Sequence, residues 1–373
     1  MTATLDKPQP RLTLARFDDL PGLAADDHFQ AFRAYLRSAK AICEGLAPTR
    51  VAQPPSSAML AVARAALRAT IQDAAEARDF FQRWFRPWRV DPGEGRTAGF
   101  LTGYYEPRLT GSLTPTPEFT GPVLGRPADL ATFPPGETRA GFEGLSGAQI
   151  LPGGGLRPYP ARARIEAGVK RRQPILWLRD AVEVFLAQVQ GSARVDLPDG
   201  RRVRLAYDGR NGQPYTSIGR LLIEAGEIGE KEMSLARLKQ WLRANGLAPG
   251  GKARALMQRN RSYVFFKLET DFDPSDGPTG GGGIVLSALR SIAIDRAIWP
   301  YGAPFWIDAE LPWRAESASP FRRLMIAQDT GSAILGPARA DIFFGQGEEA
   351  GARAGAIRHP AQFTVLLPVA NTP

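Results

Sequence analysis

The sequence predicts an α+β protein, mainly β, with a small closed β-barrel in its C-terminal third. Three observations lead to this prediction. Apolar residues recur at helical spacing before residue 85, Gly and Pro punctuate the chain every few residues over 92–160, and short strand-like runs follow one another beyond Tyr263. Strands this short and this regularly spaced are typical of a small closed barrel.

The N-terminal part of the chain is predicted to be helical. A first helix begins at Asp27, and a second, Ala-rich amphipathic stretch covers 57–84. The apolar face of the first helix is formed by Phe29, Phe32, Leu36, Ala39 and Cys43. The place of Cys43 on this face indicates a small buried hydrophobic residue rather than a reactive thiol.

The centre of the chain combines helices with a hairpin. A helix is expected over 179–189, and a hairpin over 195–206 turns at an Asp-Gly pair between alternating strands. A further helix over 235–244 follows Ser234, which has the side chain of a typical N-cap. We therefore expect a mixed α and β region before the barrel strands.

Short strands are expected throughout the C-terminal third. The predicted strands are 263–266, 283–286, 292–295, 304–307, 323–327 and 363–367. The glycine run at 280–283 lacks the following Lys-Ser/Thr of a phosphate-binding loop, so it is expected to be a flexible turn. No repeat of 20–50 residues is visible.

Composition excludes several classes of protein. At roughly 150 residues per domain, 373 residues suggest two domains, and the apolar runs are too short to cross a bilayer. One cysteine, Cys43, excludes a disulfide framework and a multi-Cys metal site, and two histidines, His28 and His359, exclude a His-rich metal centre. We therefore expect no metal and no cofactor.

The net charge of +9 suggests an acidic partner such as nucleic acid, anionic lipid or an acidic polysaccharide. The basic residues are scattered and lack interleaved aromatic residues, so nucleic-acid binding is not expected. The first 21 residues carry charges throughout and no apolar stretch of signal-peptide length. This fits either a cytoplasmic protein or a chain that starts after a removed export signal.

Carboxylates are the expected acid–base groups, because the chain has only two histidines and lacks the G-x-S-x-G motif of a serine nucleophile. The densest polar pattern is 328–347, QDTGSAILGPARADIFFGQG. Asp329 follows one predicted strand and Asp341 precedes another strand-like run, with glycines beside both. Two such aspartates could face a cleft at a barrel rim. From the residues alone, the alternative that each aspartate caps a turn stays open.

Motifs follow one another in a distinctive order over roughly residues 97–360. They are TGYYEP at 102–107, QGSARV at 190–195, YDGRNGQPY at 207–215, SIG at 217–219, RSYVFF at 261–266, RSIAID at 290–295, QDTGSAI at 328–334, GP at 336–337, RAD at 339–341 and GQG at 345–347. No single tripeptide is specific. In this number and order they strongly resemble the membrane-bound lytic transglycosylase A family.

The resemblance implies a double-psi β-barrel domain that is interrupted by an inserted second β-rich domain. The barrel domain with its N-terminal helices would comprise 1–105 and 261–373, and the inserted substrate-groove domain would comprise 106–260. Glycan strands of peptidoglycan would bind in the groove between them. The resemblance also implies the periplasmic side of the cell envelope, often with attachment to the outer membrane.

The chemistry implied by the resemblance is cleavage of the β-1,4 bond between N-acetylmuramic acid and N-acetylglucosamine without water, which leaves 1,6-anhydromuramyl products. The muramyl 6-hydroxyl is a tethered nucleophile, so one carboxyl group can serve as acid and then as base. The motifs assign this role to Asp341 and make Asp329 its supporting acid. Protonation of Asp341 near neutral pH requires a raised pKa.

Substrate contacts are expected from polar and aromatic side chains in the matched motifs. These candidates are Tyr105, Glu106, Gln190, Ser192, Tyr207, Asn211 and Tyr215. Glu106 stands where members of the family vary. For each of these residues, a structural role in a turn or in the core stays open.

Two other readings compete with the lytic transglycosylase. A non-catalytic, expansin-like wall-binding protein would share this barrel and an aspartate in a similar motif. A hydrolytic glycosidase would release reducing ends instead of anhydro ends. Analysis of the products formed from purified sacculi separates all three.

Overall fold

The computed structural model describes residues 9–93, 95–134, 137, 139–168 and 173–369. The expected mixture of helices and strands is confirmed, and the described chain divides into two compact units. Among these residues, the barrel unit comprises those within 9–105, 274–345 and 353–369, and the inserted unit comprises those within 106–273 and 346–352. No helix among the described residues has the length and hydropathy of a membrane span.

The barrel unit contains a closed β-barrel, as the sequence predicts. Around the barrel the strands are β3 (Gly99–Glu106), β17 (Arg358–Pro368), β14 (Pro304–Leu311), β15 (Ser319–Asp329), β13 (Ser291–Ala293) and β16 (Arg339–Gln346), and β16 pairs with β3 to close it. Strand β13 runs parallel to β15 and antiparallel to β16. Two further strands, β2 (Phe85–Val90) and β1 (Leu12–Leu14), extend the sheet from β17.

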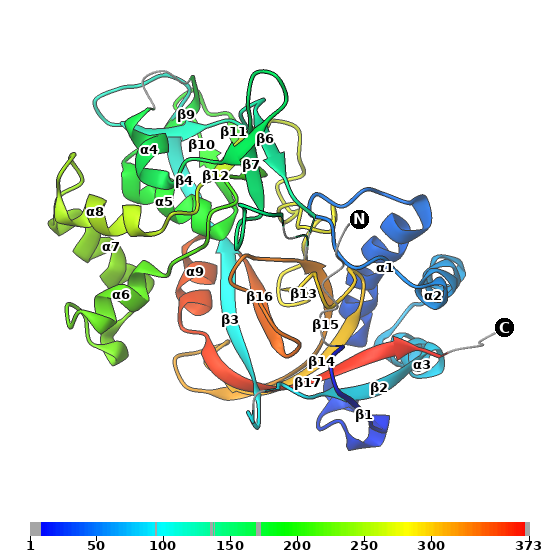
Figure 1. Cartoon of the computed structure of the whole chain (residues 1–373). Helices are drawn as coiled ribbons and strands as arrows, with labels where there is room; N and C mark the ends of the chain where they lie inside the picture. Colours follow the sequence, from blue (N-terminus) through cyan, green and yellow to red (C-terminus); the bar gives the residue numbers. More distant parts are fainter. Residues whose placement is uncertain (1–8, 94, 135–136, 138, 169–172, 370–373) are drawn as a thin grey trace. The chain divides into compact units, whose positions relative to one another are not determined.

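Three helices pack beside the barrel (Figure 1): α1 (His28–Glu44), α2 (Ser57–Arg68) and α3 (Ala74–Trp84). The predicted stretch over 57–84 is therefore two helices, because Asp73 caps a new helix by accepting from the backbone N–H of Glu76. The aromatic rings of α1 and α3 interlock, with Phe32 and Phe80 centroids 5.0 Å apart. Leu324 and Ile326 of β15 join this core.

A buried ion pair fixes the segment before α1 to the barrel. Both terminal nitrogens of Arg290 donate to the carboxylate of Asp26 at 2.8 Å, and Asp26 also accepts from the backbone N–H of Leu324. Gln328, which is fully buried next to Asp329 in sequence, donates to the carbonyl of Ala34 in α1 at 2.8 Å. These hydrogen bonds therefore fix the C-terminal half of β15, which leads to Asp329, against α1 and the segment before it.

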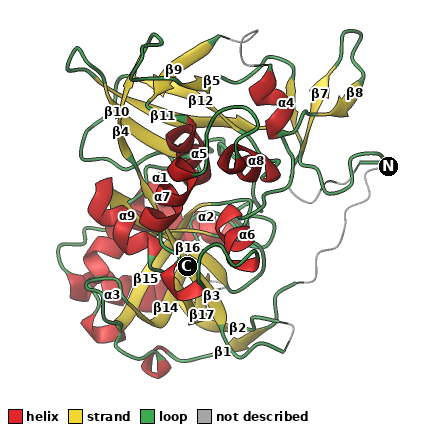
Figure 2. Cartoon of the chain, turned by 90° about the vertical axis from the view of Figure 1, so that its left-hand side faces the viewer, coloured by secondary structure: helices red, strands yellow, loops and turns green. Residues whose placement is uncertain are grey.

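The inserted unit is built on a six-stranded sheet (Figure 2). In spatial order its strands are β12 (Val264–Glu269), β11 (Arg202–Arg210), β10 (Ser192–Asp196), β4 (Arg108–Ser112), β9 (Pro174–Leu178) and β5 (Gly121–Leu124). Its helices are α4 (Arg162–Ala167), α5 (Ala181–Gln190), α6 (Ile218–Glu224), α7 (Leu235–Ala244) and α8 (Lys252–Arg259). The predicted hairpin and the N-cap at Ser234 are confirmed.

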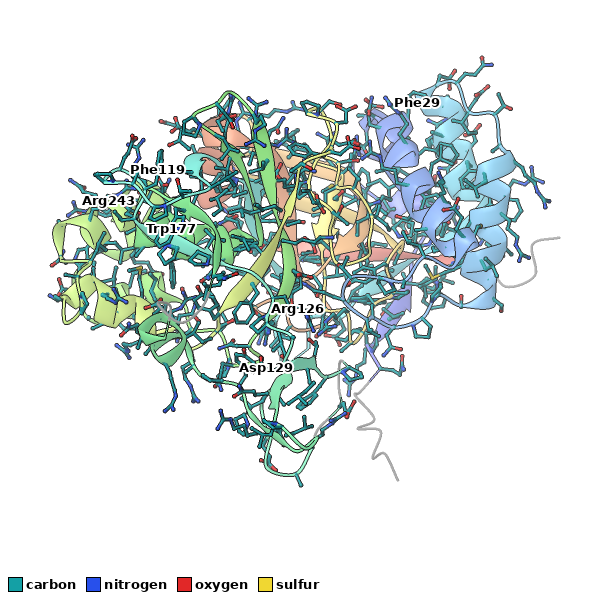
Figure 3. All side chains as sticks on the ribbon, turned by 90° about the horizontal axis from the view of Figure 1, so that it is seen from above. Phe29, Phe119, Arg126, Asp129, Trp177 and Arg243 are labelled. Atoms are coloured by element: carbon teal, nitrogen blue, oxygen red, sulfur yellow. The ribbon has the colours of Figure 1, made fainter. Side chains whose placement is uncertain are left out.

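A smaller sheet of β6 (Leu130–Thr132), β7 (Gly147–Ile150) and β8 (Leu156–Pro158) belongs to the same unit. Arg126 and Asp129 precede β6 (Figure 3). Arg126 donates to the carbonyls of Asp208 and Leu130, at 2.8 and 2.9 Å. These contacts join the small sheet to β11. The last helix, α9 (Gly347–Gly355), follows β16.

The predicted strand 263–266 is present as β12, but its place and the predicted strand 283–286 differ from the structure. The segment 261–273, predicted with the barrel, lies in the inserted unit, because β12 pairs with β11 over six registered positions. The segment 283–286 forms no strand but one isolated bridge, between Thr279 and Val285, because a turn with Gly283 at φ +72° folds it back on the preceding residues.

Candidate active site

Strand register brings Asp329 and Asp341 to the same part of the barrel. Ala293 of β13 is the register partner of Asp329 on β15 and of Asp341 on β16. Residues in register on neighbouring strands present their side chains to the same face of a sheet. The two aspartates of the 328–347 pattern, twelve positions apart in sequence, therefore lie one strand apart on either side of β13.

The carboxyl group of Asp341 accepts one side-chain hydrogen bond. The hydroxyl of Thr102 on β3 donates to Oδ1 of Asp341 at 2.7 Å. Thr102 Oγ1 in turn accepts from Nη2 of Arg339 at 2.7 Å. The residue Asp341 as a whole is half-buried.

Burial raises the pKa of Asp341 to about 6. The positive charge of Arg339 and the hydrogen bond from Thr102 act against this rise, and the negative charge of Asp329 adds to it. Burial outweighs the two opposing influences. An acid with such a pKa can carry a proton near neutral pH, which is what a general acid needs.

Asp329 has a different environment, in which three donors surround its carboxylate. Oδ1 accepts from the backbone N–H groups of Gly281 and Thr330 at 2.7 and 2.8 Å, and Oδ2 accepts from the hydroxyl of Tyr104 at 2.8 Å. All three partners donate, which suits an ionised carboxylate. Burial, with the negative charges of Asp329 and Asp341, raises the pKa of Tyr104 well above its ordinary value, so its hydroxyl keeps its proton.

The glycine loop at 280–283, predicted as a flexible turn, is part of this site. A Cβ on Gly281 would stand 2.6 Å from the hydroxyl oxygen of Tyr301 and 3.3 Å from Oδ1 of Asp329, so only glycine can bring its N–H to the carboxylate there. The loop is held from outside, because the backbone N–H of Arg50 donates to the Gly281 carbonyl at 2.9 Å. The Arg50 side chain donates to the carbonyl of Thr330.

The structure does not support a substrate role for three predicted residues. Glu106 is fully buried, and its two oxygens accept from Arg194 and Arg204 at 2.6 and 2.7 Å. Asn211 is also fully buried, where its side chain donates to two backbone carbonyls and accepts from the N–H of Tyr263. Tyr105 is 6% exposed. These side chains serve the fold.

The other predicted groove residues all belong to the inserted unit. Ser192 lies in β10 and is 6% exposed, which leaves little of it for a ligand. Gln190 at the end of α5, Tyr207 in β11 and Tyr215 in the following loop are half-buried. The latter three keep the accessibility that a sugar contact requires.

Sequence reasoning missed Thr102, Tyr104 and Arg339 as site residues. The sequence of β3 could have identified Thr102 and Tyr104 as a pair, because side chains alternate between the two faces of a strand. Thr102 and Tyr104 share the face of the two aspartates, and Tyr105 points to the opposite one. Alternation alone shows that Tyr104 and Tyr105 cannot both face the site, and the partner strand decides which one does.

Comparison with known proteins gives consistent matches over both units. The family model described as the MltA specific insert domain matches residues 100–267, and the 3D domain model matches 290–367. The membrane-bound lytic murein transglycosylase A of Escherichia coli K12 is 30% identical over 308 residues, which cover 81% of this chain and 74% of that protein.

Two solved structures share the fold over nearly the whole chain. A membrane-bound lytic murein transglycosylase from Agrobacterium tumefaciens superposes with a TM-score of 0.83 at 34% identity, covering 96% of this chain and 97% of the other. MltA from Neisseria gonorrhoeae, in a monoclinic form, has a TM-score of 0.75 at 28% identity and covers 100% and 98%.

Proposed function

The chain belongs to the membrane-bound lytic transglycosylase A family and is a peptidoglycan lytic transglycosylase, and from this premise we propose that Asp341 is its catalytic acid and base. The motif resemblance found in the sequence is thereby confirmed. The observation that supports the role of Asp341 is its combination of burial with a single neutral hydrogen-bond donor, which raises its pKa to about 6.

In the proposed reaction, Asp341 protonates the glycosidic oxygen that leaves N-acetylmuramic acid, and the bond from this oxygen to the anomeric carbon breaks. The muramyl 6-hydroxyl oxygen then bonds to the same carbon, and its proton returns to the Asp341 carboxylate. The result is a 1,6-anhydromuramyl end and a shortened strand, and the carboxyl group recovers its starting state. One acid is enough because the nucleophile is already attached to the substrate.

Asp329 supports this reaction as a fixed negative charge. Three donors hold its two oxygens in place, whereas a hydrolytic glycosidase requires its second carboxylate to activate a water molecule or to attack the sugar. The charge of Asp329 helps to keep Asp341 protonated. This pairing favours the non-hydrolytic reaction over hydrolysis.

The proposed substrate is the glycan strand of peptidoglycan, with Gln190, Tyr207 and Tyr215 as the candidates for sugar contacts. A polymer that carries lactyl and peptide carboxylates also fits the net charge of +9, so binding should weaken as salt increases. A site of action in the cell envelope is supported by relatives that are named membrane-bound lytic murein transglycosylases. We extend this proposal to the periplasmic side, with association to the outer membrane.

Incubation with purified sacculi, followed by mass spectrometry of the released muropeptides, tests the proposal. We expect anhydromuramyl products from the native chain and a loss of about 10²–10⁴-fold in turnover for Asp341→Asn. Asp18→Asn, a change at an exposed residue of the barrel unit, is the matched control and should leave turnover unchanged. Reducing ends would indicate a hydrolase, and binding without cleavage would indicate an expansin-like protein.

A further inference from the structure

The two oxygens of the Asp341 carboxyl group are not equivalent. Oδ1 accepts from Thr102, whereas the described residues place no hydrogen bond on Oδ2. Thr102 in turn accepts a hydrogen bond from Arg339, which lies two residues before Asp341 on strand β16. The site therefore contains a hydrogen-bonded chain that runs from the Arg339 guanidinium through the Thr102 hydroxyl to Oδ1 of the Asp341 carboxyl group.

We propose that Arg339 is a positioning residue that, through the hydroxyl of Thr102, occupies Oδ1 of Asp341 and reserves Oδ2 as the oxygen that exchanges the proton with the glycan. This inference rests on the proposed function of Asp341 as the acid. The proposed role of Arg339 and Thr102 does not require either side chain to contact the substrate.

The direction of both hydrogen bonds follows from the chemistry of the groups. A guanidinium group donates and cannot accept, so Thr102 Oγ1 must be the acceptor in its contact with Arg339. The single hydroxyl hydrogen of Thr102 is then left for Oδ1 of Asp341. Because Oδ1 accepts this hydrogen, the transferable proton of the acid form resides on Oδ2.

Arg339 is itself held in place. Its Nη1 donates to the carbonyl of Ala340, and its guanidinium lies over the ring of Phe100, 5.5 Å from the centroid. No carboxylate among the described residues lies within ion-pair distance of it, and the residue is half-buried. Burial lowers the pKa of Arg339, and the charge of Asp341 opposes this, but a guanidinium stays charged at every working pH.

Several charged or titratable groups influence Asp341, and their effects have opposite signs. Arg339 on the same strand lowers its pKa together with the Thr102 hydrogen bond, and Asp329 on β15 raises it. Tyr104 on β3 carries no charge near neutral pH, and the charge of Arg50, whose side chain donates to the Thr330 carbonyl, acts to lower the pKa of Tyr104. Among these groups, only Arg339 acts on Asp341 through a hydroxyl that can be removed separately.

The expected signs are specific. The acid form of Asp341 is the active one, so activity falls as the pH rises through its pKa. Removing the cation or the hydroxyl donor destabilises the carboxylate, raises the pKa, and moves the alkaline limb of the pH profile to higher pH. Loss of orientation lowers the plateau rate at the same time.

The test is the pH profile of turnover on a soluble peptidoglycan oligomer for Arg339→Gln, Thr102→Val and the double variant. We expect each single variant to move the alkaline limb upward by about 0.5–1 pH unit and to lower the plateau by roughly tenfold. The double variant should show less than the sum of both effects, because Arg339 acts through Thr102. Thr102→Ser, which keeps the hydroxyl, should restore the native profile.

Two further variants keep the outcome interpretable. Arg339→Lys keeps the positive charge but loses the planar guanidinium group. The alkaline limb of its pH profile should therefore stay near the native position, while its plateau turnover falls. Arg89→Gln removes an exposed charge of β2 and should change nothing. An unmoved or lowered limb in Arg339→Gln, or additive effects in the double variant, would overturn the positioning role. An active Asp341→Asn would instead overturn the proposed function itself.

Discussion

Glu106 of the inserted unit is a fully buried carboxylate, whereas Asp341 of the barrel unit is a half-buried one, and the charges around them differ. Each oxygen of Glu106 accepts from a guanidinium, and the two arginines also stack on Phe272, at 5.6 Å for Arg194 and 4.2 Å for Arg204. Asp341 accepts from one neutral hydroxyl and has Asp329 as a neighbour. Burial with full charge compensation gives a structural ion cluster, and burial without it gives an acid that holds a proton.

The largest effect in this comparison is expected for Glu106→Gln. The substitution keeps the shape but removes the buried negative charge on which the guanidinium groups of Arg194 and Arg204 converge, which should lower the free energy of unfolding by about 3–5 kcal/mol. Denaturant unfolding followed by fluorescence measures this. The matched control is Glu118→Gln, whose exposed pair with Arg179 should contribute less than about 1 kcal/mol. Equal effects of the two changes would show that Glu106 is not a structural centre.

The same chemical change at the barrel acid should act in the opposite direction. The pKa of Asp341 is raised from 3.8 to about 6 in the folded state, so the folded state binds the proton more tightly than the unfolded chain, and the native protein loses stability relative to a neutral side chain as the pH rises from about 4 to about 6. Above pH 6, Asp341→Asn should therefore raise the free energy of unfolding by up to about 3 kcal/mol. The difference should vanish in acid, where both side chains are neutral. A variant less stable than the native chain at alkaline pH contradicts this expectation.

A smaller effect is expected for Asp329→Asn. Removing the neighbouring negative charge lowers the pKa of Asp341, so the alkaline limb of the pH profile should move to lower pH. Turnover at its optimum should fall by about tenfold, because Tyr104 and the glycine loop lose their charged acceptor. The measurement is the release of anhydromuropeptides across the pH range. A limb that moves to higher pH, or a dead variant beside a fully active Asp341→Asn, would exchange the roles of the two aspartates.

Local pattern carried much of the fold prediction. The helical period before residue 85 and the short strands after Tyr263 gave the fold class, and an Asp-Gly pair placed the hairpin between β10 and β11. Local pattern predicts 261–273 with the barrel, whereas the segment lies in the inserted unit, because its pairing with β11 joins parts of the chain that are far apart in sequence. The run 283–286 has the composition of a strand but no neighbouring strand to complete it.

The site could be predicted only in part, because some of its contacts join segments that are far apart in sequence. Asp329 and Asp341 stand out in sequence because polar residues follow strand-like runs. The residues that distinguish their environments come from far away: Thr102 is separated by 239 positions from Asp341, and Gly281 by 48 from Asp329. Glu106 has a residue type suited to a substrate contact, and only its two arginine partners, 88 and 98 positions away, show that it is structural.

The most direct measurement is the titration of the Asp341 carboxyl group by carbon NMR, with the signal assigned by its absence in Asp341→Asn. We expect a pKa of about 6 in the native chain, because burial exceeds the compensation offered by Thr102 and Arg339. An ordinary value of about 4 would mean that Asp341 is compensated as Glu106 is, and would contradict its role as the acid of this lytic transglycosylase.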